Sequence, residues 1–172
     1  MKKIKKFFRA LKLVLRYGED ELFKDHLTGC YLRLFFEKMA EREISLAERH
    51  QHKLCFILVD VDKLKMINDK HGHLEGDKAL KKIVEILEIN CRKTDLICRW
   101  GGDEFIIIMP DTTILASKRF LKKVCGELDK FSLSISVGTA FWEKGLDLDA
   151  LIDIADIKLL TEKRIKKLKF NV

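Results

Sequence analysis

The sequence predicts an α/β fold of the α+β type, in which helices flank a mixed, mainly antiparallel sheet of about five strands. Segments with helical periodicity alternate with short apolar runs that are typical of strands, and two of these runs are separated only by Gly101-Gly102. The chain has 172 residues, of which 47% are hydrophobic, with nine glycines and one proline. Such a chain can bury a core, which excludes a disordered or collagen-like protein.

The first part of the chain contains helical patterns on either side of one buried strand. The strand covers 54–60 (LCFILVD), which is apolar until it ends on an aspartate. We expect a helix before it, over about 31–50, and a short helical or irregular crossing after it, over 63–71. The next helix is expected to open at Gly76-Asp77, because apolar residues recur at helical spacing from there.

The second part of the chain begins with a predicted hairpin. Two short strands, 95–100 and 103–109, flank Gly101-Gly102, and a Gly-Gly pair between apolar runs predicts a two-residue turn. Three further elements follow: a helix over about 113–129, a strand over 132–142 and a helix over about 147–168. These elements complete the predicted sheet and the helices that cover it.

The basic charge of the chain is confined to its N-terminus. The formal net charge is +7, from 34 basic and 27 acidic residues. Residues 1–17 hold seven of the basic residues and no acidic one, so the remaining chain has 27 of each sign. A basic field over a whole domain is the usual signature of a nucleic-acid-binding protein. Its absence here argues against a nucleic-acid partner.

Residues 1–24 are expected to form a separate N-terminal element, with one folded domain over 25–172. Within 1–17, apolar and basic residues fall on opposite faces of a predicted helix. This helix could contact a second copy, pack on its own domain or lie on an anionic membrane surface. No apolar stretch is long enough for a transmembrane helix, and Lys12 and Arg16 interrupt the apolar run that a signal peptide would need.

The cysteines favour a reducing compartment. The chain has five, and no two of them have C-x-x-C spacing, so neither a zinc knuckle nor a redox motif is indicated. We therefore expect a cytoplasmic protein, with the N-terminal helix as its one candidate for membrane association.

Four carboxylates stand where strands end or begin. Asp60 and Asp62 close the first buried strand, and Asp103 and Glu104 directly follow Gly101-Gly102. If the hairpin lies beside that strand, these groups converge, and such a cluster needs a cation or protons. Mg²⁺ suits it, and two such ions can support an in-line phosphoryl displacement. The alternative interpretation is that these are solvated acids at strand ends and turns.

Three ordered blocks of sequence carry a resemblance to a known family. They are 60–69 (DVDKLKMIND), the pairs Gly72-His73 and Gly76-Asp77, and 99–105 (RWGGDEF). Together with 25–29 (DHLTG) and 134–138 (SISVG), they resemble the GGDEF-domain diguanylate cyclases over about residues 25–167. The resemblance implies a fold similar to that of class III nucleotide cyclases and the polymerase palm.

The resemblance also implies a reaction, in which two GTP molecules form cyclic di-GMP and release two pyrophosphates. Asp60, Asp103, Glu104 and the backbone of Val61 would hold Mg²⁺ (or Mn²⁺), two ions per active site. Asp103 and Glu104 would be catalytic, with Glu104 assisting the metal or deprotonating the attacking 3′-hydroxyl. Each domain binds one GTP, so a homodimer is implied.

Further residues match the nucleotide-binding positions of the family. Asn68 and Asp77 match guanine-recognising positions; the alternatives are a turn residue and a helix N-cap. Gly101 and Gly102 would let the backbone approach the nucleotide. The lysines implied to contact the triphosphate are Lys65, Lys163 and Lys167.

The C-terminal part departs from the family pattern. Lys166-Lys167-Leu168 stands where the family usually has Gly-Arg-Asn, so Lys167 keeps the charge of a phosphate-binding arginine without its bidentate fork. Leu160 replaces a usual tyrosine and Leu32 an asparagine. These departures concern turnover and triphosphate affinity rather than the metal and guanine positions.

Arg92 and Asp95 form an Arg-x-x-Asp string that ends five residues before Gly101. At this offset it matches the family's inhibitory site for cyclic di-GMP, although as helix-end charges the string would have no special meaning.

A second functional hypothesis follows: a catalytically silent receptor that binds cyclic di-GMP through these two residues. The retained signature residues favour the cyclase over this receptor. A palm-like nucleic-acid enzyme, the third hypothesis, would need a basic groove.

Overall fold

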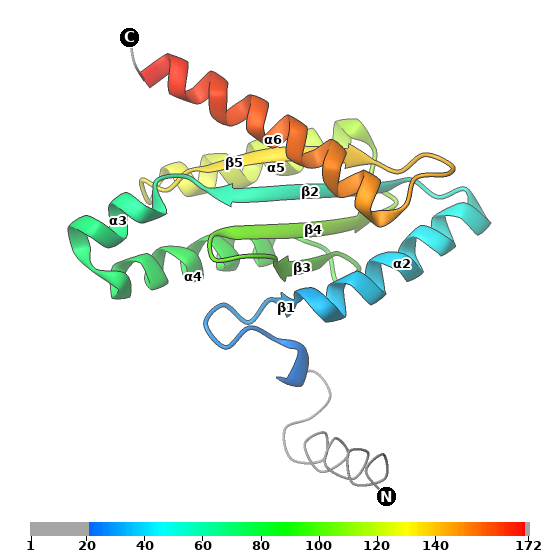
Figure 1. Cartoon of the computed structure of the whole chain (residues 1–172), viewed down its shortest axis with the longest axis horizontal. Helices are drawn as coiled ribbons and strands as arrows, with labels where there is room; N and C mark the ends of the chain where they lie inside the picture. The colour runs from blue at the N-terminus through cyan, green and yellow to red at the C-terminus, as the bar shows by residue number, and fades with distance from the viewer. Residues whose placement is uncertain (1–20, 171–172) are drawn as a thin grey trace, which may run out of the picture.

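A computed structural model describes residues 21–170 of the chain. Its five strands form one sheet in the order β1-β3-β4-β2-β5 (Figure 1). In chain order the elements are a 3-10 turn Glu21–Phe23, β1 Tyr31–Leu32, α2 Arg33–His50, β2 Leu54–Val61, α3 Leu64–His71, α4 His73–Asn90, β3 Leu96–Arg99, β4 Glu104–Pro110, α5 Ile114–Asp129, β5 Ile135–Phe141 and α6 Leu148–Phe170. Only the β1–β3 pair is parallel. The predicted fold class is confirmed.

Two hydrophobic layers cover the sheet, one on each face. In β2, successive side chains alternate between them, as expected for a strand buried on both sides. Cys55, Ile57 and Val59 pack with α4 and α5, whereas Phe56 and Leu58 pack with α2 and α6. Figure 1 shows the same division, with α2 and α6 on the near face and α4 and α5 behind the sheet. The sheet is therefore rigidly held where its strand ends form the site.

The predicted helix over 31–50 is wrong in its first two residues. Tyr31 and Leu32 form β1, which pairs in parallel with Cys98 and Arg99, and α2 begins only at Arg33. The strand is too short to show a period of its own in the sequence.

The predicted helix at Gly76 begins earlier than expected, at His73. Gly72 alone separates α3 from α4, with φ 85° and ψ 160°, a conformation that glycine adopts without steric cost. Asp77 is therefore inside α4 and does not cap it, which overturns the N-cap interpretation.

The predicted hairpin is confirmed, because β3 and β4 pair antiparallel, but its predicted two-residue turn is wrong. Arg99 pairs with Phe105, so four residues from Trp100 to Asp103 separate β3 from β4. The backbone N–H groups of Trp100 and Gly101 both donate to the carbonyl of Glu104, at 2.8 and 3.2 Å. Neither glycine has the positive φ that a type I′ turn needs. The strand boundaries otherwise move by one to three residues from those expected.

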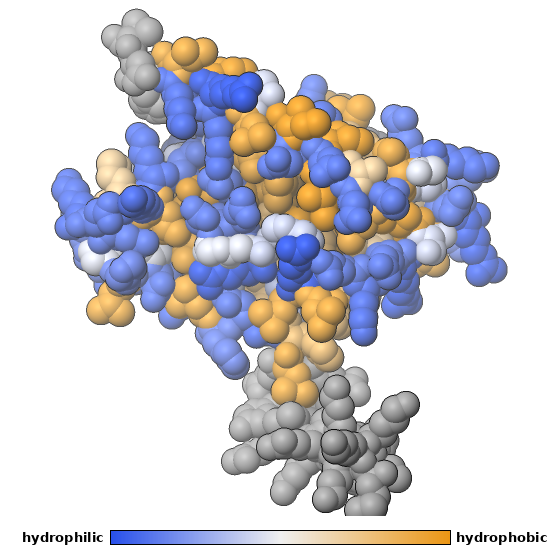
Figure 2. Space-filling view, in the orientation of Figure 1, coloured by the Kyte–Doolittle hydropathy of each residue, from blue (hydrophilic) through white to orange (hydrophobic). Residues whose placement is uncertain are grey.

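The molecular face that carries α2 and α6 is mostly hydrophilic. Figure 2 shows hydrophobic side chains gathered along α6. Ile157, Leu160 and Leu168 are exposed there. Leu160 lies on the surface, so its difference from the family's tyrosine does not alter the core.

The predicted amphipathic helix over 1–17 lies outside the described residues. Within residues 21–170, no helix is long and apolar enough to cross a membrane.

Candidate active site

The structure brings the strand-end carboxylates together at one edge of the sheet. Asp60, near the end of β2, is directly opposite Glu104, the first residue of β4. The N–H of Val61 donates to the carbonyl of Asp103 at 3.0 Å, which holds the loop before β4 against the end of β2. The antiparallel register of β2 and β4 thus places the Asp60 and Asp103–Glu104 segments side by side.

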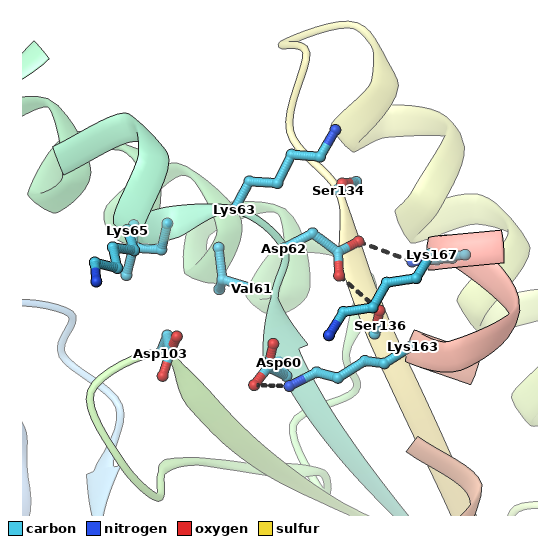
Figure 3. A pocket seen from close by; sticks show the side chains of 12 residues that line it. Asp60, Val61, Asp62, Lys63, Lys65, Asp103, Ser134, Ser136, Lys163 and Lys167 are labelled. Carbon is cyan, nitrogen blue, oxygen red and sulfur yellow. Dashed lines mark hydrogen bonds and ion pairs between the residues drawn. The ribbon is translucent and has the colours of Figure 1, made fainter. Parts of the chain in front are cut away.

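Asp60 is a buried carboxylate with a cationic partner. The residue is only 7% exposed, and its Oδ2 lies 2.5 Å from Nζ of Lys163 on α6 (Figure 3). Burial raises the pKa of Asp60, the Lys163 ammonium opposes that rise, and the charge of Asp103 adds to it. The pKa of Asp60 is therefore raised mainly because the carboxylate is buried, despite its contact with Lys163.

Glu104 lies in a similar environment to Asp60. Its pKa is raised first by burial and then by the charges of Asp60 and Asp103. A Cβ at Gly101 would lie 3.0 Å from Oε2 of Glu104, so a larger residue there would crowd this carboxylate. At Gly102 an added Cβ would meet nothing within 4 Å, so the backbone there is open to a ligand.

Asp62 has a different environment from Asp60 although only one residue separates them. Its Oδ1 accepts a hydrogen bond from Ser136 Oγ at 2.6 Å, and its Oδ2 accepts one from Lys166 Nζ at 2.8 Å. Burial acts to raise the pKa of Asp62, but these bonds outweigh it and the pKa is lowered. Asp62 therefore joins α6 to the sheet, whereas Asp60 is the carboxylate directly opposite Glu104.

A cavity of about 420 Å³ lies beside these groups. Its wall contains six of the residues that the sequence singled out: Asp60, Val61, Lys65, Asp103, Lys163 and Lys167. The remaining wall is formed by Asp62, Lys63, Leu64, Ser134, Ser136 and Lys166. Acidic groups at the strand ends thus face lysines from α3 and α6, although Figure 3 shows Lys65 extending away from the Asp60–Lys163 pair.

Asn68 and Asp77 come from the two helices that follow β2, and neither lines this cavity. Asn68 packs on Gly76, where an added Cβ would lie 1.8 Å from the Asn68 Oδ1 atom. That Oδ1 is buried and has no hydrogen-bond partner among the described residues. An unsatisfied buried acceptor is costly, and it marks a position where a ligand donor is favourable.

Arg99 connects the loop to the opening segment of the domain, a link that the sequence alone does not indicate. Its guanidinium donates from Nη2 to the carbonyl of Gly102 at 2.7 Å and from Nη1 to Asp25 Oδ1 at 2.9 Å. The same Asp25 oxygen accepts from the N–H and hydroxyl of Thr28. Burial acts to raise the pKa of Asp25, but these donors lower it. The segments 25–29 and 99–105, which both match the family pattern, are thus joined by one hydrogen-bond network.

Arg92 and Asp95 lie at the opposite end of β3 from this loop. Arg92 is exposed, whereas Asp95 is 8% exposed and accepts a hydrogen bond at 2.8 Å from the backbone N–H of Arg92. The second oxygen of Asp95 is buried without a partner among residues 21–170, and burial raises the pKa of this carboxyl. Both residues line two cavities, of about 260 and 200 Å³.

Comparison with known proteins identifies the family. The model of the family described as "Diguanylate cyclase, GGDEF domain" matches residues 22–169. The chain belongs to the GGDEF-domain diguanylate cyclase family. The chain is 34% identical over 157 residues to the diguanylate cyclase DosC of Escherichia coli K12, covering 86% of this chain and 34% of that protein. It thus spans about a third of the length of this relative.

Another curated relative and two solved structures agree with this assignment. Diguanylate cyclase DgcP of Pseudomonas aeruginosa is 29% identical, covering 100% of this chain and 27% of DgcP. Diguanylate cyclase SiaD of P. aeruginosa, solved with its activator SiaC, has a TM-score of 0.80 at 28% identity, covering 95% of this chain and 65% of that one. A microbial GGDEF domain solved with cyclic di-GMP has a TM-score of 0.78 at 31% identity, covering 84% and 92%.

The family implies divalent metal ions, and the chemistry of the carboxylate edge fits them. Across residues 21–170, no three His, Cys, Asp or Glu side chains form a ready-made metal site. Mg²⁺ needs only one or two carboxylates, because water and substrate phosphates complete its shell. Asp60 and Asp103 supply that number, and the Lys163 ammonium on Asp60 shows that a cation is stabilised there.

Proposed function

We propose that the chain is an active diguanylate cyclase, which condenses two GTP molecules into cyclic di-GMP and releases two pyrophosphates. The observation that carries this proposal is the pairing of Asp60 with Glu104, beside Asp103 and a lysine-walled cavity, in a member of this family. Curated relatives with the same domain are named diguanylate cyclases.

In the proposed mechanism, Asp60, Asp103 and the backbone of Val61 would hold Mg²⁺ or Mn²⁺, with Glu104 beside them. The bound ions would neutralise phosphate charge and assist ionisation of the 3′-hydroxyl. Glu104, whose pKa is raised, is suited to accept the proton of that hydroxyl. The 3′ oxygen then bonds to the α-phosphorus of the other GTP, and pyrophosphate leaves.

The nucleotide is held by residues around the same edge. Lys163, Lys167 and Lys65 would bind the triphosphate, with the open backbone of Gly101 and Gly102 close to it. Asn68 and Asp77 would recognise guanine, the carboxylate of Asp77 accepting from the N1–H and N2–H donors that adenine does not present together. A mismatched base would leave buried polar groups unpaired, at a cost of about 1–3 kcal/mol.

The product has two guanylate units, whereas each domain would bind one GTP. We therefore propose that catalysis occurs between two copies, with each supplying one metal site. Arg92 and Asp95 would bind cyclic di-GMP and inhibit synthesis, since the guanidinium of Arg92 is exposed for a phosphate or a guanine edge.

The test is to incubate the chain with GTP and Mg²⁺ and to separate the nucleotides by chromatography. The wild type should form cyclic di-GMP and Asp103→Ala none, while Asp153→Ala, at an exposed position of α6, should match the wild type. If no product forms from GTP or ATP while cyclic di-GMP binds tightly, the chain is a receptor rather than a cyclase.

A further inference from the structure

Lys163 occupies the position on Asp60 that the proposed function gives to a divalent ion. Its Nζ lies 2.5 Å from Oδ2 of Asp60, and the lysine side chain is 33% exposed, compared with 10% for the aspartate side chain. Figure 3 shows the lysine crossing from α6 to the end of β2 to make this contact. The lysine thus neutralises a carboxylate that water can barely reach.

The ammonium and a divalent ion cannot share that carboxylate without strong repulsion. At a separation of a few ångströms the charges of an ammonium and a divalent ion repel each other strongly, even with substantial dielectric screening. The side chain of Asp60 is only 10% exposed, which reduces the screening between two cations that contact it. A metal ion that reaches Asp60 must therefore displace Lys163 from it.

The helix that carries Lys163 is anchored independently of Asp60. Three residues further along α6, Nζ of Lys166 contacts Asp62 Oδ2 at 2.8 Å and the carbonyl of Ile135 at 2.5 Å. The same ammonium lies 3.3 Å from Glu162 Oε1. Lys163 can consequently exchange partners by side-chain rotation, while α6 stays in place.

We propose that Lys163 is an exchangeable counter-cation, which neutralises Asp60 in the free enzyme and moves to the substrate phosphates when a divalent ion takes that carboxylate. The inference rests on the proposed function only in assigning the metal to Asp60. A metal ion that binds alone takes Asp60 from Lys163, whereas a triphosphate supplies the ammonium with a new anionic partner. Metal and triphosphate therefore bind with positive coupling, and Lys163 is the residue that couples them.

The test is the affinity for Mn²⁺ without nucleotide, measured by electron paramagnetic resonance of the free ion. Lys163→Met removes the competing charge and should tighten Mn²⁺ binding about five-fold or more relative to the wild type. Lys158→Met removes a lysine of the same helix that contacts the carbonyl of Thr139, and it should leave the affinity unchanged. Addition of a non-hydrolysable GTP analogue should tighten Mn²⁺ binding more in the wild type than in Lys163→Met.

Several results would overturn the exchange. The first is an unchanged or weaker Mn²⁺ affinity in Lys163→Met, and the second is no detectable Mn²⁺ binding in that variant. The third is tight Mn²⁺ binding that persists when Lys163→Met is combined with Asp60→Asn. Lys163→Gln is a second variant without the lysine charge, and thermal unfolding of Lys163→Met and Lys163→Gln shows whether they are folded. Misfolding would weaken Mn²⁺ binding, so it cannot cause the expected gain in affinity. If the wild type synthesises cyclic di-GMP but Lys163→Met does not bind Mn²⁺ more tightly, only the proposed exchange is refuted. If Lys163→Met binds Mn²⁺ more tightly but the wild type makes no cyclic di-GMP, only the proposed cyclase activity is refuted.

Discussion

Gly76 determines how closely α3 and α4 approach at the residues proposed to recognise guanine. A Cβ at this position would lie 1.8 Å from Asn68 Oδ1 and 2.9 Å from its Cγ, so alanine must displace the Asn68 side chain. Gly76 is buried, which leaves little room for that displacement. The glycine of this motif is thus explained by packing, and its effect on function passes through Asn68.

We predict that Gly76→Ala raises the KM for GTP several-fold and lowers the free energy of unfolding by about 1–3 kcal/mol. The matched control is Gly126→Ala on α5, where an added Cβ would meet nothing within 4 Å. That variant should keep the wild-type KM and gain up to about 1 kcal/mol from helix propensity. Steady-state kinetics and urea unfolding measure both effects; equal KM values in the two variants would contradict the role given to Gly76.

Arg92 offers a second test at a single residue. Arg92 makes its hydrogen bonds with Asp95 through its backbone N–H and carbonyl, so Arg92→Ala should leave the turn and the fold intact. We expect cyclic di-GMP to inhibit the wild type non-competitively, and about ten-fold more cyclic di-GMP to be needed to inhibit the variant. Lys93→Ala is the control. If the wild type and Arg92→Ala are inhibited equally in GTP titrations at fixed cyclic di-GMP, Arg92 is not part of an inhibitory site.

The docking of α6 on the sheet decides the geometry of the site at the scale of whole elements. Gly138 in β5 permits this docking, because a Cβ there would lie 1.8 Å from the carbonyl oxygen of Ala155. The Asp62–Lys166 pair fixes the other end of the contact, where Lys163 and Lys167 reach the cavity. The positions of Lys163 and Lys167, the two phosphate-binding candidates on α6, therefore depend on this one packing arrangement.

The Asp62–Lys166 pair predicts a pH dependence of stability. The pKa of Asp62 is lowered in the folded chain, so its contribution is complete above the unfolded pKa of about 3.9 and is lost as the pH falls through the folded value. Asp62→Asn should thus lose about 1–3 kcal/mol of unfolding free energy at pH 7 and progressively less towards pH 3. Urea unfolding at both pH values measures the difference between wild type and variant. A difference that stays constant with pH would contradict the ion pair, and Asp153→Asn serves as the control.

At the scale of the whole molecule, strand and helix periodicity predict the fold class. The sequence brings Asp60 and Glu104 together only if the hairpin lies beside β2, and the β2–β4 pairing meets that condition. The sequence does not predict β1, whose two residues show no period, or the wider loop, which depends on the carbonyl of Glu104 and the side chain of Arg99. The sequence also does not predict the contacts of Arg99 with Asp25 and of Lys166 with Asp62. They join positions 74 and 104 residues apart, which only the completed fold brings together.

If catalysis occurs between two copies, as proposed, the rate depends on assembly. We predict that cyclic di-GMP formed per molecule of enzyme rises with enzyme concentration and then levels off. Excess Asp103→Ala should suppress the wild type, because a mixed dimer has one complete metal site and can form only one of the two bonds. Rates measured over about a hundred-fold range of concentration test this; a rate per molecule that stays constant, with no suppression by the variant, would show that single copies suffice.

The stoichiometry of products from GTP tests the central claim most directly. The purified chain is incubated with GTP and Mg²⁺, and cyclic di-GMP and pyrophosphate are quantified in the same samples. The account predicts two pyrophosphates for each cyclic di-GMP, none of either product with Asp60→Asn, and no cyclic product from ATP. Release of pyrophosphate without cyclic di-GMP, or a cyclic product that persists in Asp60→Asn, would contradict it.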